Sequence, residues 1–145
     1  KLYQGKNLAA IDMKDYLINL GKHIMDSFQT DDRINLAYKG GTVELDVDAA
    51  IPIGLIVNEL ITNALKYAFP DKSKGTIEIV LHKQQENKLF LEVADDGIGQ
   101  EEGHSKKDGF GTQLINLLVQ QMDGKSYSDT KNGTKISFEF NLNSL

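Results

Sequence analysis

The chain has 145 residues, of which 40% are hydrophobic and 26% are charged, which fits one globular domain and excludes an extended disordered chain. Its formal charge of −5 disfavours binding along a nucleic-acid backbone, and the absence of cysteine excludes disulfides and thiol chemistry. No apolar run approaches the roughly 20 residues that cross a bilayer, so the sequence predicts a soluble domain without membrane contact.

The first third of the chain predicts one helix and two short strands. Asp12 offers an N-cap to an amphipathic helix, whose apolar residues recur at helical spacing as far as Phe28. Alternating apolar residues then predict strands over 34–38 and 43–47, with a break at the glycine pair 40–41.

The middle of the chain carries the clearest helical pattern. From Ile53 to Ala68, apolar residues recur at alternating increments of three and one, which no strand shows. This spacing predicts a helix over about 50–69. Pro52 fits its first turn, where a missing N–H costs no hydrogen bond, and Pro70 lies beyond its end.

A hairpin and a glycine-rich loop follow this helix. Alternation over 77–81 and 89–93 predicts two strands, and the polar stretch Lys83–Lys88 connects them. The next segment, 97–111, contains five of the 13 glycines and almost no apolar side chains, which predicts a surface loop.

The end of the chain predicts a helix and a second hairpin. The helix begins near Thr112 and has Gly124 as its C′ residue. The pair Asn132-Gly133 is typical of a type I′ turn, which pairs residues 125–130 with an alternating strand over 136–142. The order is helix and two strands, three times over, which places the chain in the α+β class.

A polar stripe lies on the central helix, opposite its apolar side. Glu59 and Asn63 are four residues apart, with Lys66 and Tyr67 one turn further, so a carboxylate, a carboxamide, an ammonium group and an aromatic ring project in one direction. Hard oxygen atoms suit Mg²⁺, and lysine suits a phosphate. The alternative is an ordinary solvated helix face.

Two glycine motifs bound the loop. The segment DDGIG at 95–99 follows a strand and places a carboxylate where it accepts the amino group of adenine and rejects the keto oxygen of guanine. The alternative is a simple Asp-Gly turn. The segment GFG at 109–111 leads into a helix N-terminus, whose free N–H groups favour a phosphate. Neither motif forms a P-loop or a Rossmann fingerprint.

Four segments, taken in chain order, resemble the N, G1 and G2 boxes and the closing strand of the histidine-kinase ATP-binding domain: NELITNALKY at 58–67, DDGIG at 95–99, GFGTQL at 109–114 and NGT at 132–134. The resemblance implies the Bergerat or GHKL fold shared with Hsp90, DNA gyrase and MutL, a two-layer α/β sandwich with helices on one face of a mixed sheet. The lead-in and the stretch Leu45–Leu60 are similar to sensor kinases of the HisKA_2 type.

The resemblance implies a role for each residue of the helical stripe. Asn63 becomes the Mg²⁺ ligand, and Glu59 becomes the general base or polar residue one turn earlier. Lys66 contacts a phosphate, and Tyr67 forms a wall of the nucleotide pocket. ATP and Mg²⁺ are therefore the expected cofactors.

The same resemblance places the base and the phosphates of ATP at the other motifs. Asp95 binds the adenine amino group, and Thr134 completes the adenine pocket from the last strand. The loop 100–108 becomes the ATP lid, which is short and lacks a Phe box. The glycines of both motifs shape the base pocket and admit the phosphates: Gly97, Gly99, Gly109 and Gly111.

The resemblance also implies a domain organisation. Residues 1–11 form the end of an upstream dimerisation and phosphoacceptor region or a linker, and residues 12–145 form the ATP-binding catalytic domain. Family members of this type carry the phosphoacceptor histidine on a preceding helix, and none of His23, His82 and His104 has that context. The chain, which does not begin with Met, is therefore interpreted as the catalytic part of a longer kinase.

The implied function is that of a cytoplasmic protein-histidine kinase domain in a two-component system. It transfers the γ-phosphoryl group of ATP to a histidine on the dimerisation helix of the parent kinase, and a response regulator receiver domain is the further partner. One alternative is an anti-sigma-type serine kinase or a related GHKL ATPase, which needs no histidine helix. The other is a degenerate interaction module, which the intact polar motifs disfavour.

Overall fold

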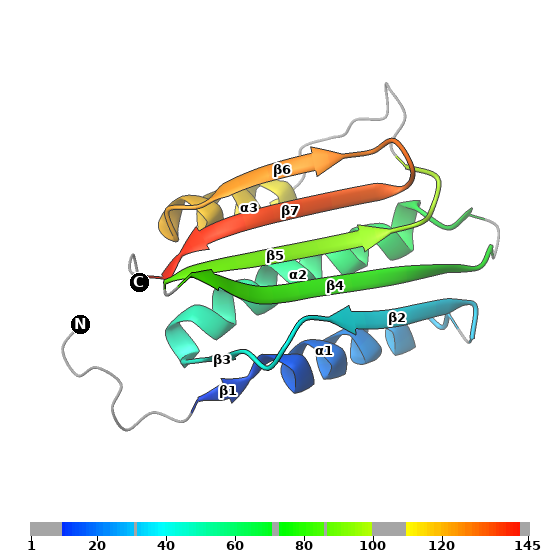
Figure 1. Ribbon diagram of the computed structural model, residues 1–145. Helices are drawn as coiled ribbons and strands as arrows, with labels where there is room; N and C mark the ends of the chain where they lie inside the picture. Colours follow the sequence, from blue (N-terminus) through cyan, green and yellow to red (C-terminus); the bar gives the residue numbers. More distant parts are fainter. Residues whose placement is uncertain (1–9, 31, 71–72, 86, 100–109, 143–145) are drawn as a thin grey trace.

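The computed structural model describes residues 10–142, apart from residues 31, 71–72, 86 and 100–109 (Figure 1). Three helices and seven strands follow one another in these residues. In chain order they are β1 (Ile11–Asp12), α1 (Met13–Ser27), β2 (Ile34–Lys39), β3 (Glu44–Leu45), α2 (Val47–Tyr67), β4 (Gly75–Gln85), β5 (Lys88–Asp95), α3 (Phe110–Gln121), β6 (Lys125–Asp129) and β7 (Thr134–Asn141).

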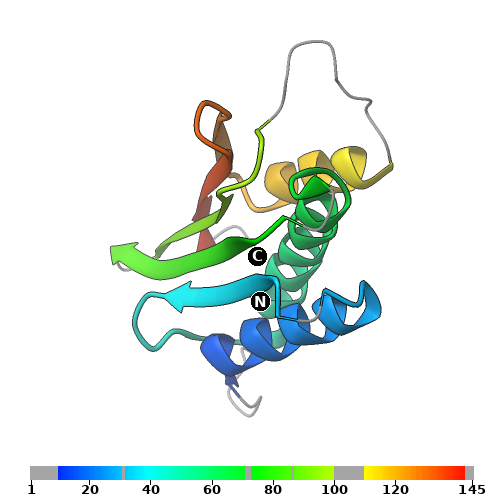
Figure 2. The same ribbon diagram turned by 90° about the vertical axis from the view of Figure 1, so that its right-hand side faces the viewer.

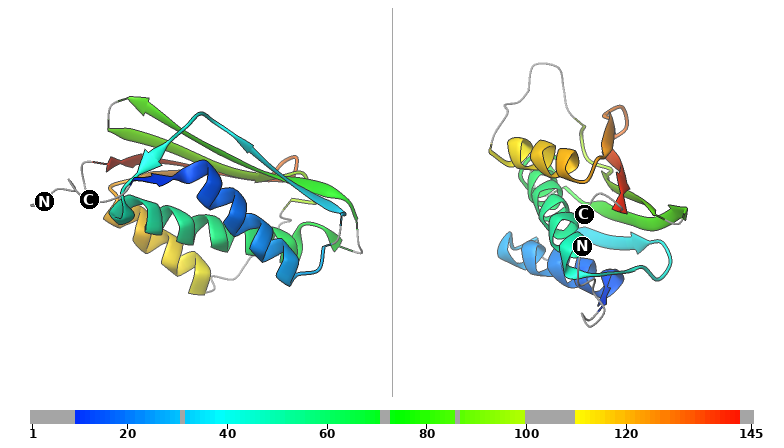
Figure 3. Two further views of the ribbon diagram at one scale, coloured as in Figure 1. Left: turned by 90° about the horizontal axis from the view of Figure 1, so that it is seen from below. Right: turned by 90° about the vertical axis from the view of Figure 1, so that its left-hand side faces the viewer.

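One layer of the molecule is a five-stranded mixed sheet with the order β2-β4-β5-β7-β6. β2 runs parallel to β4, and the other neighbours are antiparallel. The three helices form the second layer on one face of this sheet, with α2 between α1 and α3 (Figures 2 and 3). The α+β class and the two-layer sandwich are therefore confirmed.

The helix α1 begins where the sequence predicts. The carboxylate of Asp12 accepts hydrogen bonds from the backbone N–H groups of Lys14 at 3.1 Å and Asp15 at 3.3 Å, which caps the helix. Tyr16 on this helix packs over Gly54 of α2, where a Cβ atom would lie only 2.8 Å from Cζ of the tyrosine ring. The glycine thus lets the two helices approach closely.

The helix α2 begins three residues earlier than predicted. Asp46 is its N-cap and accepts a hydrogen bond from the backbone N–H of Ala49 at 3.3 Å. Val47, which alternation predicts in a strand, is therefore helical. Pro52 lies in the second turn, not the first, so it has no N–H to donate to the carbonyl four residues earlier, and the helix continues through it.

The hydrophobic core lies between the helices and the facing side of the sheet. Alternate residues of β4 and β5 point into it, whereas α2 contributes its apolar side. By length and composition α2 is the one candidate membrane span among the described helices, but it packs in this core. The largest fully buried side chains are Phe138, Phe140, Met13, Leu17, Ile53, Ile56, Ile61, Ile77, Ile79, Leu81, Leu89 and Leu91.

In the described part of the chain, the other face of the sheet carries no helix (Figure 3) and mixes polar side chains with a few apolar ones, such as Phe90, which stacks on His82. Lys39 and Glu78 form an ion pair of 3.3 Å across β2 and β4. Glu92 accepts a hydrogen bond of 3.0 Å from the hydroxyl of Ser137 on β7. These cross-strand pairs suit a face in contact with water.

Sequence pattern gives no partners for the strands in the first half of the chain, and the structure supplies them. β2 and β3, which flank the glycine pair, do not pair with each other: β2 joins the main sheet, and β3 pairs with β1. The predicted hairpin of β4 and β5 is confirmed, but most of its predicted connection lies in the strands, which extend to Gln85 and from Lys88. The polar residues belong to strand ends that protrude beyond the core.

The helix α3 begins at Phe110, slightly before the predicted start, and ends in a different cap. Asp123 is the C′ residue, with a φ of 51°, so the prediction of Gly124 at this position is wrong. The N–H of Gly124 bonds to the carbonyl of Val119 at 2.9 Å, as the next residue of such a cap does. An aspartate tolerates the left-handed conformation better than most residues.

The last hairpin is confirmed, but its turn type is not. β6 ends at Asp129 and β7 begins at Thr134, which leaves a four-residue connection, 130–133. A type I′ turn needs positive φ at both central residues, and only Gly133 has it, at 88°. The N–H of Lys131 donates to the Asp129 carboxylate at 3.0 Å, which shapes the longer loop.

Candidate functional site

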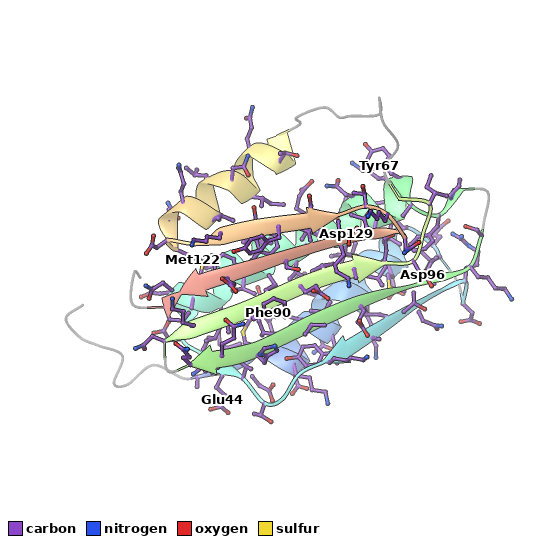
Figure 4. The ribbon with its side chains drawn as sticks, turned by 45° about the horizontal axis from the view of Figure 1, so that its top comes forward. Glu44, Tyr67, Phe90, Asp96, Met122 and Asp129 are labelled. Atoms are coloured by element: carbon purple, nitrogen blue, oxygen red, sulfur yellow. The ribbon has the colours of Figure 1, made fainter. Side chains whose placement is uncertain are left out.

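The polar stripe of α2 lies beside the first turn of α3, where Glu59 contacts Gly111. Glu59 and Asn63 are partly buried, whereas Lys66 and Tyr67 are exposed, Tyr67 by 69%. In Figure 4, Tyr67 lies toward the same end of the sheet as Asp96 and Asp129. The C-terminal half of α2 therefore ends near the turn that follows β5.

Asp95 is the last residue of β5 and pairs with Ile77 on one side and Thr134 on the other. Strand alternation directs its side chain to the same face as the buried Val93, toward the helices. Its carboxylate accepts a hydrogen bond from the N–H of Gly97 at 2.9 Å. Burial raises the pKa of Asp95, although backbone N–H groups of Gly97 and Thr134 oppose the shift.

Gly97 packs directly against the end of α2. A Cβ atom at Gly97 would lie 2.6 Å from the Cβ of Ala68 and would also meet the carbonyl oxygen of Ala68. That same oxygen accepts a hydrogen bond from the N–H of Ile98 at 3.0 Å. The DDGIG segment therefore packs against and hydrogen-bonds to the C-cap of α2, the helix that carries the polar stripe.

Gly99 and Gly133 bring the loop before β7 against the same segment. Both have positive φ, 74° and 88°. A Cβ atom at Gly99 would lie 2.7 Å from the carbonyl oxygen of Thr130, and one at Gly133 would meet the carbonyl oxygen of Asp95. Only glycine fits such positions. Gly133 belongs to the NGT motif, but sequence reasoning did not include it among the site residues.

Gly111 lies in the first turn of α3 and faces Glu59 on α2. A Cβ atom at Gly111 would fall within the Glu59 carboxylate, whose Oε1 would be 2.6 Å away and whose other two atoms would be nearer. The resemblance implies that this glycine admits a phosphate. In this structure, the space that a side chain would take holds the carboxylate of Glu59 instead.

Segments distant in sequence thus meet at one end of the sandwich. Glu59 touches Gly111, Asn63 lies one helical turn from Glu59, and Asp95 pairs with Thr134. Gly109 and the predicted lid, 100–108, lie outside the described residues. The roles that the resemblance implies for Glu59, Asn63, Lys66, Tyr67, Asp95 and Thr134 stay predictions.

The donor set suits a magnesium ion that arrives with its ligand. Among the described residues, no group of three or more His, Asp and Glu side chains could hold a metal ion. Asn63 and Glu59 offer one carboxamide oxygen and one carboxylate on one helix face. Mg²⁺ is commonly bound by only one or two protein groups together with the phosphates of a nucleotide.

A mixed sheet with three helices on one face, and a half-buried carboxylate at the end of a central strand, defines an ATP-binding domain of the GHKL fold class. Residues 48–144 match the family model described as "Histidine kinase-, DNA gyrase B-, and HSP90-like ATPase". The chain belongs to this family.

The relatives of the chain are sensor kinases. It is 30% identical over 142 residues to blue-light-activated histidine kinase 2 of Erythrobacter litoralis, a match of 92% of this chain and 41% of that protein. It is 32% identical over 108 residues to the sensor histidine kinase PdtaS of Mycobacterium tuberculosis, a match of 70% of this chain and 21% of that protein. The chain thus spans less than half the length of these curated relatives.

A solved structure agrees with these matches. The histidine kinase domain of the Erythrobacter litoralis EL346 blue-light-activated histidine kinase superposes with a TM-score of 0.82 at 26% identity, covering 97% of this chain and 66% of that one. The expected family, the GHKL fold and the ATP-binding catalytic domain of a sensor histidine kinase are confirmed.

Proposed function

We propose that this domain binds Mg·ATP and transfers its γ-phosphoryl group to a histidine on the dimerisation helix of a parent kinase. One observation carries the proposal: the first turn of α3 touches the polar stripe of α2 at Glu59, and the segment that follows Asp95 packs against and hydrogen-bonds to the C-cap of the same helix. The base and the phosphates of one nucleotide can therefore be bound from elements that already touch.

Asp95 recognises the adenine base. Its carboxylate is acceptor-only when ionised and retains lone pairs beyond those used by backbone N–H groups. The exocyclic amino group of adenine is a donor, whereas guanine presents a carbonyl oxygen at the equivalent position. Thr134, which is paired with Asp95, borders the same position. The site therefore favours ATP over GTP.

The phosphates are bound between α2 and α3. Asn63 holds the Mg²⁺ ion, which neutralises phosphate charge, and Lys66 contributes a positive group from the exposed side of α2. Glu59 orients the acceptor imidazole or serves as its base. Phosphoryl transfer needs positioning and charge neutralisation more than covalent chemistry from the protein, so these groups suffice.

The partners and setting follow from the sensor kinase class. The phosphorylated histidine passes its phosphoryl group to a response regulator receiver domain, and the domain works in the cytoplasm. The resemblance to the HisKA_2 type supports a histidine helix ahead of this domain.

Nucleotide specificity tests the site directly. Calorimetric titration of the chain should detect binding of Mg·ATP, and the Kd for Mg·GTP should be much higher than the Kd for Mg·ATP. The Asp95→Asn variant should lose roughly tenfold or more in ATP affinity, as expected for a hydrogen bond to a charged group, and should discriminate less between ATP and GTP. Asp129→Asn, on the exposed strand β6, is the matched control. Equal selectivity in Asp95→Asn and its parent would remove Asp95 from the base pocket.

The chemistry of the product tests the transfer. The parent kinase, labelled with ATP carrying a radioactive γ-phosphate, should yield a phosphoprotein whose label is lost in acid and kept in alkali, as for phosphohistidine. An acid-stable label would indicate a serine kinase instead. Absence of both nucleotide binding and labelling would indicate a degenerate module.

A further inference from the structure

The contact between Glu59 and Gly111 differs in kind from the other close glycine contacts. At Gly21, Gly54 and Gly124, the nearest atom to an added Cβ belongs to an uncharged side chain, and at Gly97 it is a backbone oxygen. At Gly111 all three nearest atoms belong to one carboxylate. The absence of a side chain at Gly111 therefore makes room for a charged group.

The position of this carboxylate is one that favours anions. α3 begins at Phe110, so Gly111 lies in the first turn, where backbone N–H groups have no partner within the helix. A negative charge there is stabilised by the helix dipole. Within the described part of the chain, no ion pair involves Glu59. Its negative charge therefore stands where the proposed site would receive phosphate.

We propose that Glu59, seated in the space left by Gly111, is a charge gate that excludes metal-free ATP from this site. The inference rests on the proposed nucleotide site and goes beyond it, because it makes Glu59 a determinant of which form of the nucleotide is bound. A triphosphate without a cation meets a like charge at the start of α3, and like charges at close range repel. A triphosphate with Mg²⁺ presents a cation that the carboxylate attracts.

If Glu59 acts as a charge gate, its removal should change the affinities for metal-free ATP and for Mg·ATP differently. Removing the charge of Glu59 should help metal-free ATP, because a repulsion is lost. It should not help Mg·ATP, because the carboxylate attracts that form. The ratio between the dissociation constants of the two forms is therefore the quantity that reports the gate.

The experiment is calorimetric titration of the chain with ATP in excess Mg²⁺ and with ATP in EDTA. In Glu59→Gln, the Kd for metal-free ATP should fall about tenfold, while the Kd for Mg·ATP should stay equal or rise. Glu44→Gln is the matched control, because it makes the same chemical change at an exposed residue of β3, toward the other end of the sheet from Tyr67 (Figure 4). In Glu44→Gln, the ratio of the Kd for metal-free ATP to the Kd for Mg·ATP should equal that of the parent chain.

A second variant and a second readout keep the test decisive. Glu59→Ala removes the same charge without adding a carboxamide and should shift the ratio in the same direction. Thermal unfolding without nucleotide shows whether each variant folds. An unchanged ratio in folded Glu59→Gln and Glu59→Ala, with Mg·ATP bound by the parent chain, overturns the gate alone. Failure of the parent chain to bind Mg·ATP overturns the proposed function, and the gate with it.

Discussion

Asp95 and Asp96, at the end of β5, are adjacent in sequence but have different surroundings. The carboxylate of Asp96 accepts a hydrogen bond from the N–H of Thr76 at 2.8 Å and holds the turn against β4. Asp95 faces the helices instead, and burial raises its pKa. The sequence predicts a carboxylate at this strand end, and the family resemblance points to Asp95 and not to Asp96. The structure gives the reason, because the strand register turns Asp95 toward the helices.

The raised pKa of Asp95 has a consequence for stability. A carboxyl group with a higher pKa in the folded state stabilises the fold fully below its ordinary value of 3.8, and this contribution is lost as the pH rises through the folded pKa. The ionised carboxylate therefore costs stability at neutral pH. Asp95→Asn should raise the free energy of unfolding at pH 7, and the gain should shrink as the pH falls through the raised folded pKa and be gone below 3.8.

Urea denaturation of Asp95→Asn and its parent across this pH range measures the effect. Asp96→Asn, at an exposed position with its own backbone hydrogen bond, is the control and should show no such gain. A lower stability of Asp95→Asn at pH 7 would contradict the argument. If Asp95→Asn is more stable than its parent and also binds ATP more weakly, then Asp95 contributes to binding at the expense of stability.

Two glycines of the site should respond differently to the same substitution. Gly97→Ala places a methyl group against the backbone carbonyl of Ala68, which cannot move without shifting the end of α2, so a loss of about 2 kcal/mol or more is expected. In Gly111→Ala the atoms nearest the new methyl group belong to the end of the flexible Glu59 side chain, and the helix gains propensity, so the free energy of unfolding should change by less than about 1 kcal/mol.

Urea unfolding of the two alanine variants makes the comparison. Equal losses would show that the Glu59 side chain cannot move away and that its position is as rigid as the backbone at Gly97. The sequence alone could not rank these glycines, because the ranking depends on what each one touches.

At the scale of elements, the helices follow closely from sequence pattern and the strand partners do not. The three-and-one spacing of α2 and the cap at Asp12 identify helices, since both signals are local. The parallel pairing of β2 with β4 and the two-residue pair of β1 with β3 depend on tertiary packing. Val47 illustrates the conflict: alternation favours a strand, but the cap at Asp46 starts the helix.

The C-terminal cap of α3 offers a stabilising substitution. Asp123 has a φ of 51°, where glycine has no steric cost and other residues do, so Asp123→Gly should stabilise the fold by up to about 1 kcal/mol. Gly124→Ala is the contrasting variant and should destabilise, because its Cβ would lie 2.7 Å from Cδ1 of Phe140 and 2.8 Å from the carbonyl oxygen of Glu139. A loss of stability in Asp123→Gly, by urea denaturation, would show that its side chain has a further role.

At the scale of the whole molecule, the candidate site joins segments from α2, the end of β5, the start of α3 and the start of β7. Motif order predicts which segments take part. The contact of Glu59 with Gly111 and the fastening of the DDGIG segment to Ala68 were not predictable, because both depend on how the layers pack. The predicted lid lies outside the described residues.

A ligand bound between these segments should stabilise the whole fold. A ligand present at 100 times its Kd stabilises the native state by about 2.7 kcal/mol, so Mg·ATP should raise the Tm by several degrees. Asn63→Ala should unfold at about the same temperature as the parent chain without nucleotide, since Asn63 is only partly buried, but should lose the shift with Mg·ATP. A full shift in Asn63→Ala would argue against Asn63 as the metal ligand.

The register of β5 with β7 links the proposed base selectivity of Asp95 to hydrophobic packing elsewhere along the same strands. Phe138 lies opposite Leu91 and Phe140 opposite Leu89, and the same alternation turns Asp95 toward the helices. A slip of one residue between β5 and its neighbours would expose those aromatic side chains to water and carry Asp95 to the outer face of the sheet. The proposed preference for adenine therefore depends on apolar side chains that do not contact the base.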